Sequence, residues 1–272
     1  MEVVVQEDGK VRLIWAGKTR VTGFDLAIRL REGHLQPGDL ETTPWEKIGG
    51  TDGFGHFSLW RRRLTHSDRA IIEERLYVYP QALRHEIHFL REITDLQGSR
   101  DFCAPAVWVS AFIPAEDCSY FLCTFGLDGE GGDFPGGYWP EALWGKVGQG
   151  FTSKPFAPLV IYDENGAVAV APGELFLLSP LVARGQTSGR ALAGDFPKIP
   201  QGTTLSTWFA WGKDPSAALQ HLGRLLSSGK KKAFDRSHPL LSRLGYWNAY
   251  GSYYTELIHP LEERIVQVLA AE

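Results

Sequence analysis

The sequence predicts a mainly β protein, a sandwich of antiparallel sheets followed by a helix and a carboxyl-terminal β-α unit. Short segments of alternating apolar and polar residues fill the chain up to about Gly212, separated by glycine, proline, aspartate and asparagine. A segment with the apolar spacing of an amphipathic helix follows. The chain then ends with a strand-like segment and a second segment of helical spacing. Many short strands joined by frequent turns are typical of packed antiparallel sheets.

The clearest strand segment is LRHEIHFLREIT, which begins at Leu83 and alternates up to Ile93. Because alternate side chains of a strand point to opposite faces, one face is expected to be buried and the other wetted. Comparable patterns occur in AIIEERLYVY, AVWVSAF, SYFLCTF, PLVIY, AVAVA, ELFLL and TTLSTWFAW. Between PLVIY and AVAVA, the stretch DENG at 163–166 predicts a hairpin turn.

An amphipathic helix is predicted in KDPSAALQHLGRLLSSGKKK. Asp214 is suited to cap its amino terminus, and Pro215 is suited to the first helical position. Its apolar side consists of Ala218, Leu222, Leu225 and Leu226. Glycine at position 229 provides the stop.

These patterns divide the chain into three parts. Residues 1–228 are the sandwich with its terminal helix, 229–243 are a polar linker, and 244–272 are one β-α unit. A lone β-α pair cannot bury both faces of its strand. We therefore expect the last part to be the first unit of a larger (β/α) structure that this chain does not contain.

Composition and charge exclude several classes of partner. A formal net charge of -4 over 272 residues lacks the basic excess that nucleic acids or anionic membranes require. Neither a secretion leader nor an apolar run of about 18 residues is present, so a soluble, cytoplasmic protein is expected. The cysteines Cys103, Cys118 and Cys123 match no zinc or redox spacing. Reduced thiols are expected, and neither a metal nor a cofactor is predicted.

An aromatic segment, LGYWNAYGSYYTEL, occupies residues 244–257. With IPQGTTLSTWFAWGKDPSAALQHLGRLLSSGKKK before it, it resembles the junction between sandwich and (β/α)8 barrel in the raffinose-synthase-like and α-galactosidase families of glycoside hydrolases. The hallmark there is Leu-Gly-Tyr-Trp-Thr-Asp-Asn-Gly-Ala-Tyr-Tyr. Here Asn248, Ala249 and Tyr250 replace Thr-Asp-Asn, and Ser252 replaces the alanine. The likeness is good over about the last two fifths of the chain.

This resemblance implies an amino-terminal β-supersandwich of the galactose-mutarotase-like kind. In such families both catalytic carboxylates are aspartates on later barrel strands, yet 25 residues follow Trp247, whereas a barrel takes about 250. The implied role is a non-catalytic domain of a carbohydrate-active enzyme, and no catalytic residue is assigned. The implied partners are the missing barrel and a galactoside-like carbohydrate; a homo-oligomer stays open. Ala249, in place of the family aspartate, implies altered sugar recognition or lost activity.

Substrate contacts are predicted from the aromatic clusters. Trp247, Asn248 and Tyr250 are expected to form part of a sugar-binding floor at the end of the first barrel strand. Trp139 belongs to the glycine-rich segment GLDGEGGDFPGGYWPEALW and is expected to reach over a sugar site. The aromatic rings of residues 244–257 are equally suited to packing between sandwich and barrel.

Two other functions remain open at this stage. A free-standing aldose epimerase of the mutarotase type would use a histidine and a carboxylate as acid and base. Its candidate residues are His56, His66, His85, His88 and Glu174. A carbohydrate-binding or scaffold sandwich would need only exposed tryptophans. A metal held by both histidines of HEIH is not expected, because an odd offset on a strand points them to opposite faces.

Overall fold

The computed structural model describes residues 1–6, 10–67, 70–97, 105–124, 142–151, 156–174, 181–192 and 197–228. All belong to the first of two units into which the chain divides, Met1–Lys231. The linker, the carboxyl-terminal β-α unit and most of ELFLL and of the glycine-rich segment lie outside the described residues. The domain boundaries at 228 and 243 therefore stay predictions.

Within the described ranges the chain forms seventeen strands, all antiparallel to their neighbours, two short 3-10 helices and one α-helix. The first nine strands are β1 (Glu2–Val5), β2 (Val11–Trp15), β3 (Lys18–Leu30), β4 (Gly33–Leu35), β5 (Glu41–Thr42), β6 (Glu46–Asp52), β7 (Gly55–His66), β8 (Ala70–Tyr79) and β9 (Ala82–Phe89). The remaining strands are β10 (Val107–Pro114), β11 (Ser119–Thr124), β12 (Ala142–Lys146), β13 (Phe156–Asp163), β14 (Gly166–Pro172), β15 (Leu181–Arg184), β16 (Thr187–Leu192) and β17 (Thr204–Gly212). The helices are η1 (Pro37–Asp39), η2 (Val147–Gln149) and α1 (Pro215–Ser228).

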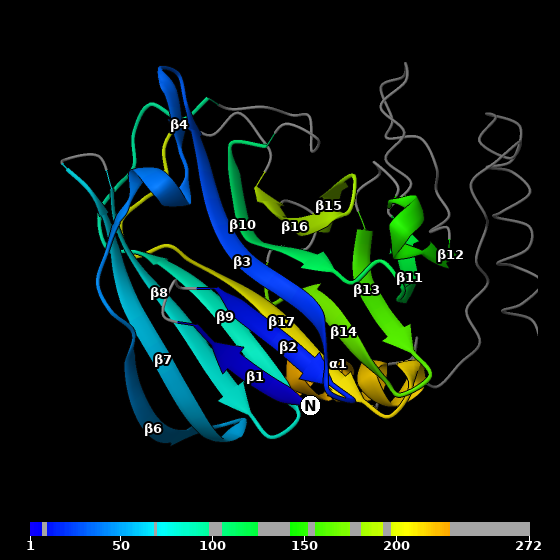
Figure 1. The fold of residues 1–272 in the computed structure, drawn as a ribbon. Helices are drawn as coiled ribbons and strands as arrows, with labels where there is room; N and C mark the ends of the chain where they lie inside the picture. The colour runs from blue at the N-terminus through cyan, green and yellow to red at the C-terminus, as the bar shows by residue number, and fades with distance from the viewer. Residues whose placement is uncertain are drawn as a thin grey trace, which may run out of the picture. The chain divides into compact units, whose positions relative to one another are not determined.

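The strands pair into one continuous sheet that folds over on itself (Figure 1). One layer runs β1-β2-β3-β10-β16-β15, and the pairing of β15 with β13 leads into the second layer, β13-β14-β17-β9-β8-β7-β6. Strands β11 and β12 extend from β13, while β4 and β5 lie on the edges of β3 and β7. Sequential hairpins account for most neighbours, but β3 with β10 and β9 with β17 join distant parts of the chain.

The core lies between the two layers. Leu13, Phe24 and Phe112 of the first layer share one cluster with Val168 and Phe209 of the second. The rings of Phe24, Phe112 and Phe209 lie with centroids 4.7 to 6.4 Å apart. Such aromatic contacts add to the stabilisation that burial of the side chains gives.

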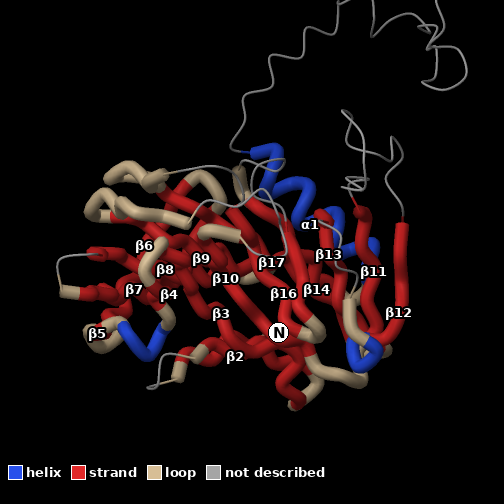
Figure 2. The backbone as a smooth tube through the Cα atoms, turned by 90° about the horizontal axis from the view of Figure 1, so that it is seen from above, coloured by secondary structure: helices blue, strands red, loops and turns tan. Residues whose placement is uncertain are grey.

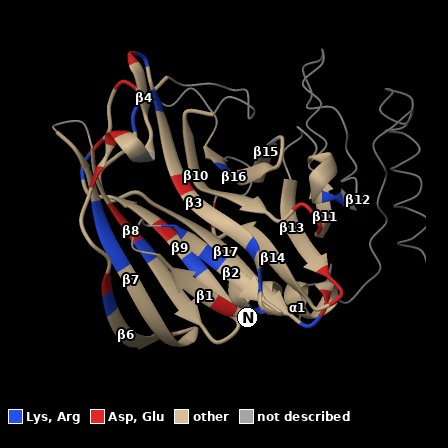
Figure 3. Ribbon diagram, in the orientation of Figure 1, with Lys and Arg blue, Asp and Glu red and all other residues tan. Residues whose placement is uncertain are grey.

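Helix α1 covers the outer face of β14 and β17, and reaches β13 (Figure 2). Strand β14 is buried on both faces: its valines point into the sandwich, and its alanines lie under Ala218 and Leu222 of the helix. Figure 3 shows charges spread along β7, β8 and β9, whereas β14 and β17 have none. A charge-free strip of small residues lets the helix approach the sheet closely.

The strand pattern read from the sequence is confirmed. In β9, Leu83, His85, Ile87 and Phe89 are buried, while the alternate residues Arg84, Glu86 and His88 are partly exposed. The strand ends at Phe89 rather than near Ile93, because the chain turns there and Ile93 is buried through a separate bridge to Ile199. The DENG hairpin joins β13 to β14, and the Asp163 carboxylate accepts a hydrogen bond from the backbone N–H of Asn165 at 2.7 Å.

The predicted helix cap is also present, since Oδ1 of Asp214 accepts a hydrogen bond from the backbone N–H of Ala217 at 2.8 Å. Replacing Asp214 by Ala should lower the free energy of unfolding by about 1 kcal/mol, because that N–H then loses its acceptor. Urea unfolding followed by circular dichroism measures the change. Gln220→Ala, at an exposed position of α1, is the control. Equal midpoints for the two variants would show that the cap contributes nothing.

Candidate functional site

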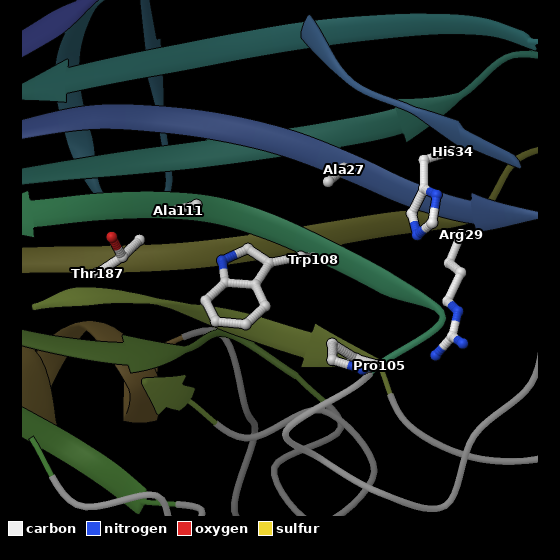
Figure 4. A pocket seen from close by; sticks show the side chains of 7 residues that line it. All are labelled: Ala27, Arg29, His34, Pro105, Trp108, Ala111 and Thr187. Atoms are coloured by element: carbon white, nitrogen blue, oxygen red, sulfur yellow. The ribbon is translucent and has the colours of Figure 1, made fainter. Parts of the chain in front are cut away.

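A pocket opens on the outer face of the first layer, over β3, β4, β10 and β16 (Figure 4). Its volume is about 530 Å³, within the range of about 300 to 1,000 Å³ that is usual for small-molecule sites. The indole of Trp108 lies at its centre and is seen face on in Figure 4. It is one of several pockets that the described residues line.

Irregular backbone in β3 and β10 sets the direction of the side chains here. Val107 and Val109 point into the core, so Trp108 between them points outward. Ser110 has a φ of +53° and lies where the pairing register of β10 shifts, so Ser110 stays buried while Ala111 faces the pocket. Gly23 of β3 lies opposite Phe112 and has a φ of +122°, and a Cβ there would lie 2.7 Å from the carbonyl oxygen of Ala111. Bulges of this kind often re-aim side chains at functional sites.

Small residues make room for the indole. Trp108 packs with Ala27, Ala111 and Ala191, and a Cβ on Gly189 would lie 2.0 Å from its Nε1 atom. A side chain larger than hydrogen at Gly189 therefore cannot coexist with this position of the ring. Only 8% of Trp108 is exposed, so the ring is held in place by its neighbours.

Polar groups lie at the two ends of the pocket. Arg29 of β3 and His34 of β4 are directly opposite each other in the strand register and lie together at one end in Figure 4. Thr187 of β16 lies at the other end, beyond Trp108. An aromatic centre with hydrogen-bonding groups at its ends is suited to a ligand with an apolar face and polar edges.

Behind the pocket, a polar network crosses the interior of the sandwich. Nδ1 of His85 lies 2.7 Å from Oγ of Ser110, which donates to Oγ1 of Thr207 at 2.9 Å. Nε2 of His85 lies 2.9 Å from Oε1 of Glu74, whose Oε2 accepts from Nε of Arg62 at 2.6 Å. Burial acts to raise the pKa of Glu74, but the hydrogen bonds and charges of His85 and Arg62 outweigh it and lower that pKa.

This network is structural rather than catalytic. Both ring nitrogens of His85 are engaged inside the sandwich, Nδ1 with Ser110 and Nε2 with Glu74. His85 has no exposed surface and Glu74 only 2%, so no ligand reaches the pair.

Glu174 does not pair with a histidine. Its carboxylate contacts the guanidinium of Arg190, a residue with no exposed surface, and Oε1 accepts from the backbone N–H of Ser206 at 2.8 Å. The guanidinium also donates to the carbonyl oxygens of Glu174 and Ser206. Glu174 therefore fixes the end of β14 against β17.

The other candidate histidines are apart from one another. His56 contacts Thr51 on an exposed hairpin, His66 is near Ser67, and His88 lies 2.7 Å from Oγ1 of Thr204. His88 faces outward while His85 faces inward, as the odd offset predicts. Among the residues that the structure describes, no group of metal-ligating side chains could hold an ion.

No protein-family model matches the sequence, and no protein of curated function does. Solved structures share its fold. A β-arabinopyranosidase superposes with a TM-score of 0.52 at 15% identity, over 78% of this chain and 38% of that one. A glycoside hydrolase family 97 enzyme from Pseudoalteromonas sp. strain K8 gives 0.49 at 9% identity, over 78% and 34%. A candidate aldose 1-epimerase of Escherichia coli K12 gives 0.34 at 10% identity, over 74% and 79%.

The likeness to the β-arabinopyranosidase supports the predicted sandwich class and shows a shared fold. The chain spans about two fifths of that enzyme and about a third of the family 97 enzyme. The finer resemblance to α-galactosidases and raffinose synthases stays a prediction.

The predicted sugar contacts Trp139, Trp247, Asn248 and Tyr250 all lie outside the described residues, so their roles stay predictions. In the described part of the chain, no helix has the length and apolar character that crossing a bilayer requires. Of the cysteines, Cys118 and Cys123 are free thiols, and burial raises the pKa of Cys118 to about 11.

Sequence reasoning missed the pocket. One local signal existed, since alternation in AVWVSAF places Trp108 opposite two core valines. That signal does not reveal that Gly189 and Ala27 leave space around the ring.

Proposed function

We propose that residues 1–228 are the non-catalytic sandwich domain of a carbohydrate-active enzyme of the glycoside hydrolase class. The fold shared with part of a much longer β-arabinopyranosidase is the observation that carries this proposal. The buried state of the His85 and Glu74 pair supports it too, because a sandwich acting alone as an epimerase needs an accessible acid and base.

In finer detail, the proposed enzyme is of the α-galactosidase or raffinose-synthase type, with its barrel beginning at residue 244. Support comes from the sequence LGYWNAYGSYY, which lies where such a barrel would start. Trp247, Asn248 and Tyr250 would then contact the sugar at the carboxyl end of the first barrel strand, where barrel enzymes bind substrate. The sandwich would hold that strand in place and help to shape the mouth of the barrel.

The test compares the 272-residue chain with the same chain joined to a complete barrel. Substrates are nitrophenyl α-D-galactopyranoside and β-L-arabinopyranoside, which have the same ring stereochemistry and differ by one hydroxymethyl group. We expect hydrolysis by the extended protein and none by the 272-residue chain. Hydrolysis or mutarotation by the 272-residue chain would refute the proposal, as would an extended protein inactive on every glycoside.

A further inference from the structure

The pocket around Trp108 has no role in the proposed function, although it has the parts of a binding site. An aromatic ring lies at its centre, two nitrogen-bearing side chains lie at one end, and a hydroxyl lies at the other (Figure 4). Each part comes from a different segment of the chain, on β3, β4, β10 and β16. A rigid sheet holds most of them in place, which lowers the entropy cost of binding.

The charge of the pocket indicates the sign of its ligand. Arg29 is always cationic, and none of the described lining residues is an acid. Within the described part of the chain, no ion pair involves Arg29. Asp25 lies opposite Ala111, four residues before Arg29 and hence about 14 Å away along β3. An anionic group beside Arg29 and His34 would therefore meet attraction, and no carboxylate among the described lining residues would compete with it.

Spacing indicates the size of the ligand. Trp108 is directly opposite Ala27 in the register of β10 and β3, and Arg29 is two residues further along β3. Two residues of a strand span about 7 Å, which is the scale of one sugar ring with its exocyclic group. A ring on the indole would thus place a substituent at Arg29, and its opposite edge would face Thr187.

We infer that this pocket binds an acidic saccharide, a hexuronate residue. The pyranose ring packs against the exposed part of Trp108 and against Ala27 and Ala111, which line the pocket beside it. The carboxylate accepts hydrogen bonds from Arg29 and His34, and a ring hydroxyl contacts Thr187. A planar guanidinium is well suited to a carboxylate, because both oxygens can be bound at once. A neutral sugar uses the same ring surface but leaves Arg29 without an anion.

The experiment is calorimetric titration of the 272-residue chain with methyl glucuronide and methyl galacturonide. The corresponding neutral glycosides and acetate are titrated in parallel. We expect the uronides to bind at least about tenfold more tightly than the neutral glycosides, since hydrogen bonds to charged groups are the stronger kind. Acetate alone should bind far more weakly than the uronides, because it lacks the ring that packs on Trp108.

Variants assign the effect to residues. Arg29→Gln should abolish the preference for the uronide, whereas Arg12→Gln, on the exposed face of β2, should leave it unchanged. Trp108→Phe should weaken binding of both sugar types. The same variant lacks the indole N–H of Trp108, so its NMR spectrum identifies which indole signal the uronide shifts. Circular dichroism verifies that each variant is folded.

Three results would overturn the inference. They are no saccharide binding, equal affinity for uronide and neutral glycoside, and an equal loss of the preference for uronide in Arg29→Gln and Arg12→Gln. If acetate displaced the uronide when both are at the same concentration, the pocket would be a simple anion site, and the inference of a saccharide site would be wrong. The titration measures binding and does not depend on hydrolysis. A failure of the uronide inference can therefore be distinguished from a failure of the proposed glycosidase role.

Discussion

Replacing Glu74 by Leu should lower the free energy of unfolding by about 3–5 kcal/mol. Glu74 is buried between two basic side chains, accepting hydrogen bonds from His85 and Arg62. Removing one partner of a buried ion pair leaves the remaining charge in a medium of low polarity, which is far more costly than losing a surface pair. Urea unfolding at neutral pH measures the difference.

The ion pair of Arg61, the residue next to Arg62 on β7, offers a matched control. Arg61 pairs with Glu46 at 2.8 Å, but both side chains are exposed, at 42% and 58%. Glu46→Leu should leave the unfolding midpoint nearly unchanged, because solvent screens that pair. If Glu46→Leu and Glu74→Leu lowered the free energy of unfolding by comparable amounts, the interior network would not stabilise the sandwich.

The effect of Glu74 should also depend on pH. Its pKa in the folded chain lies below the ordinary value of 4.5. Its contribution is therefore full above that value and is lost as the pH falls through the folded pKa. The stability gap between the native chain and Glu74→Leu should be widest near neutral pH and should narrow below about pH 4.5. A gap that widens in acid would contradict this assignment.

Replacing Phe209 by Ala should cost about 3–5 kcal/mol, as deletion of a fully buried ring usually does. Phe209 lies at the meeting point of the two layers, with ring centroids 4.7 Å from Phe24 and 5.2 Å from Phe112. The loss combines the transfer of apolar surface to water with the cavity that neighbours fill only in part. Phe24 has a φ of +86°, so the cluster also holds a strained backbone in place.

Trp144→Ala provides the control for ring removal, because Trp144 is 72% exposed on β12. The urea unfolding midpoint of Trp144→Ala should stay close to that of the native chain. The idea of a core centred on the three phenylalanines fails if Phe209→Ala and Trp144→Ala unfold at the same urea concentration.

Several features of the fold could be predicted from short patterns. Alternation in LRHEIHF correctly placed His85 on the buried face and His88 on the outer face. The DENG turn and the Asp214 cap were predictable because they depend on hydrogen bonds between residues two or three positions apart.

The candidate site was not predictable in the same way. Glu174 and the four histidines were plausible acids and bases from composition, yet Glu174 contacts Arg190, and His85 contacts Glu74. No local pattern specifies these partners, because they lie on strands that pair only after the sheet has folded over. The left-handed conformation of Ser110 has no sequence signature either, since serine seldom adopts it.

By itself, the sequence determined the alternation of buried and exposed side chains along the regular strands, the DENG turn and the start of the helix. These depend on backbone geometry within a few residues, where alternation and capping act. Only the tertiary structure decided that Ala27, Trp108 and Gly189 meet around one ring and that Glu74 and His85 pair inside the sandwich. The physical reason is that strand register and bulges are set by packing the two layers together, which no short segment of the chain encodes.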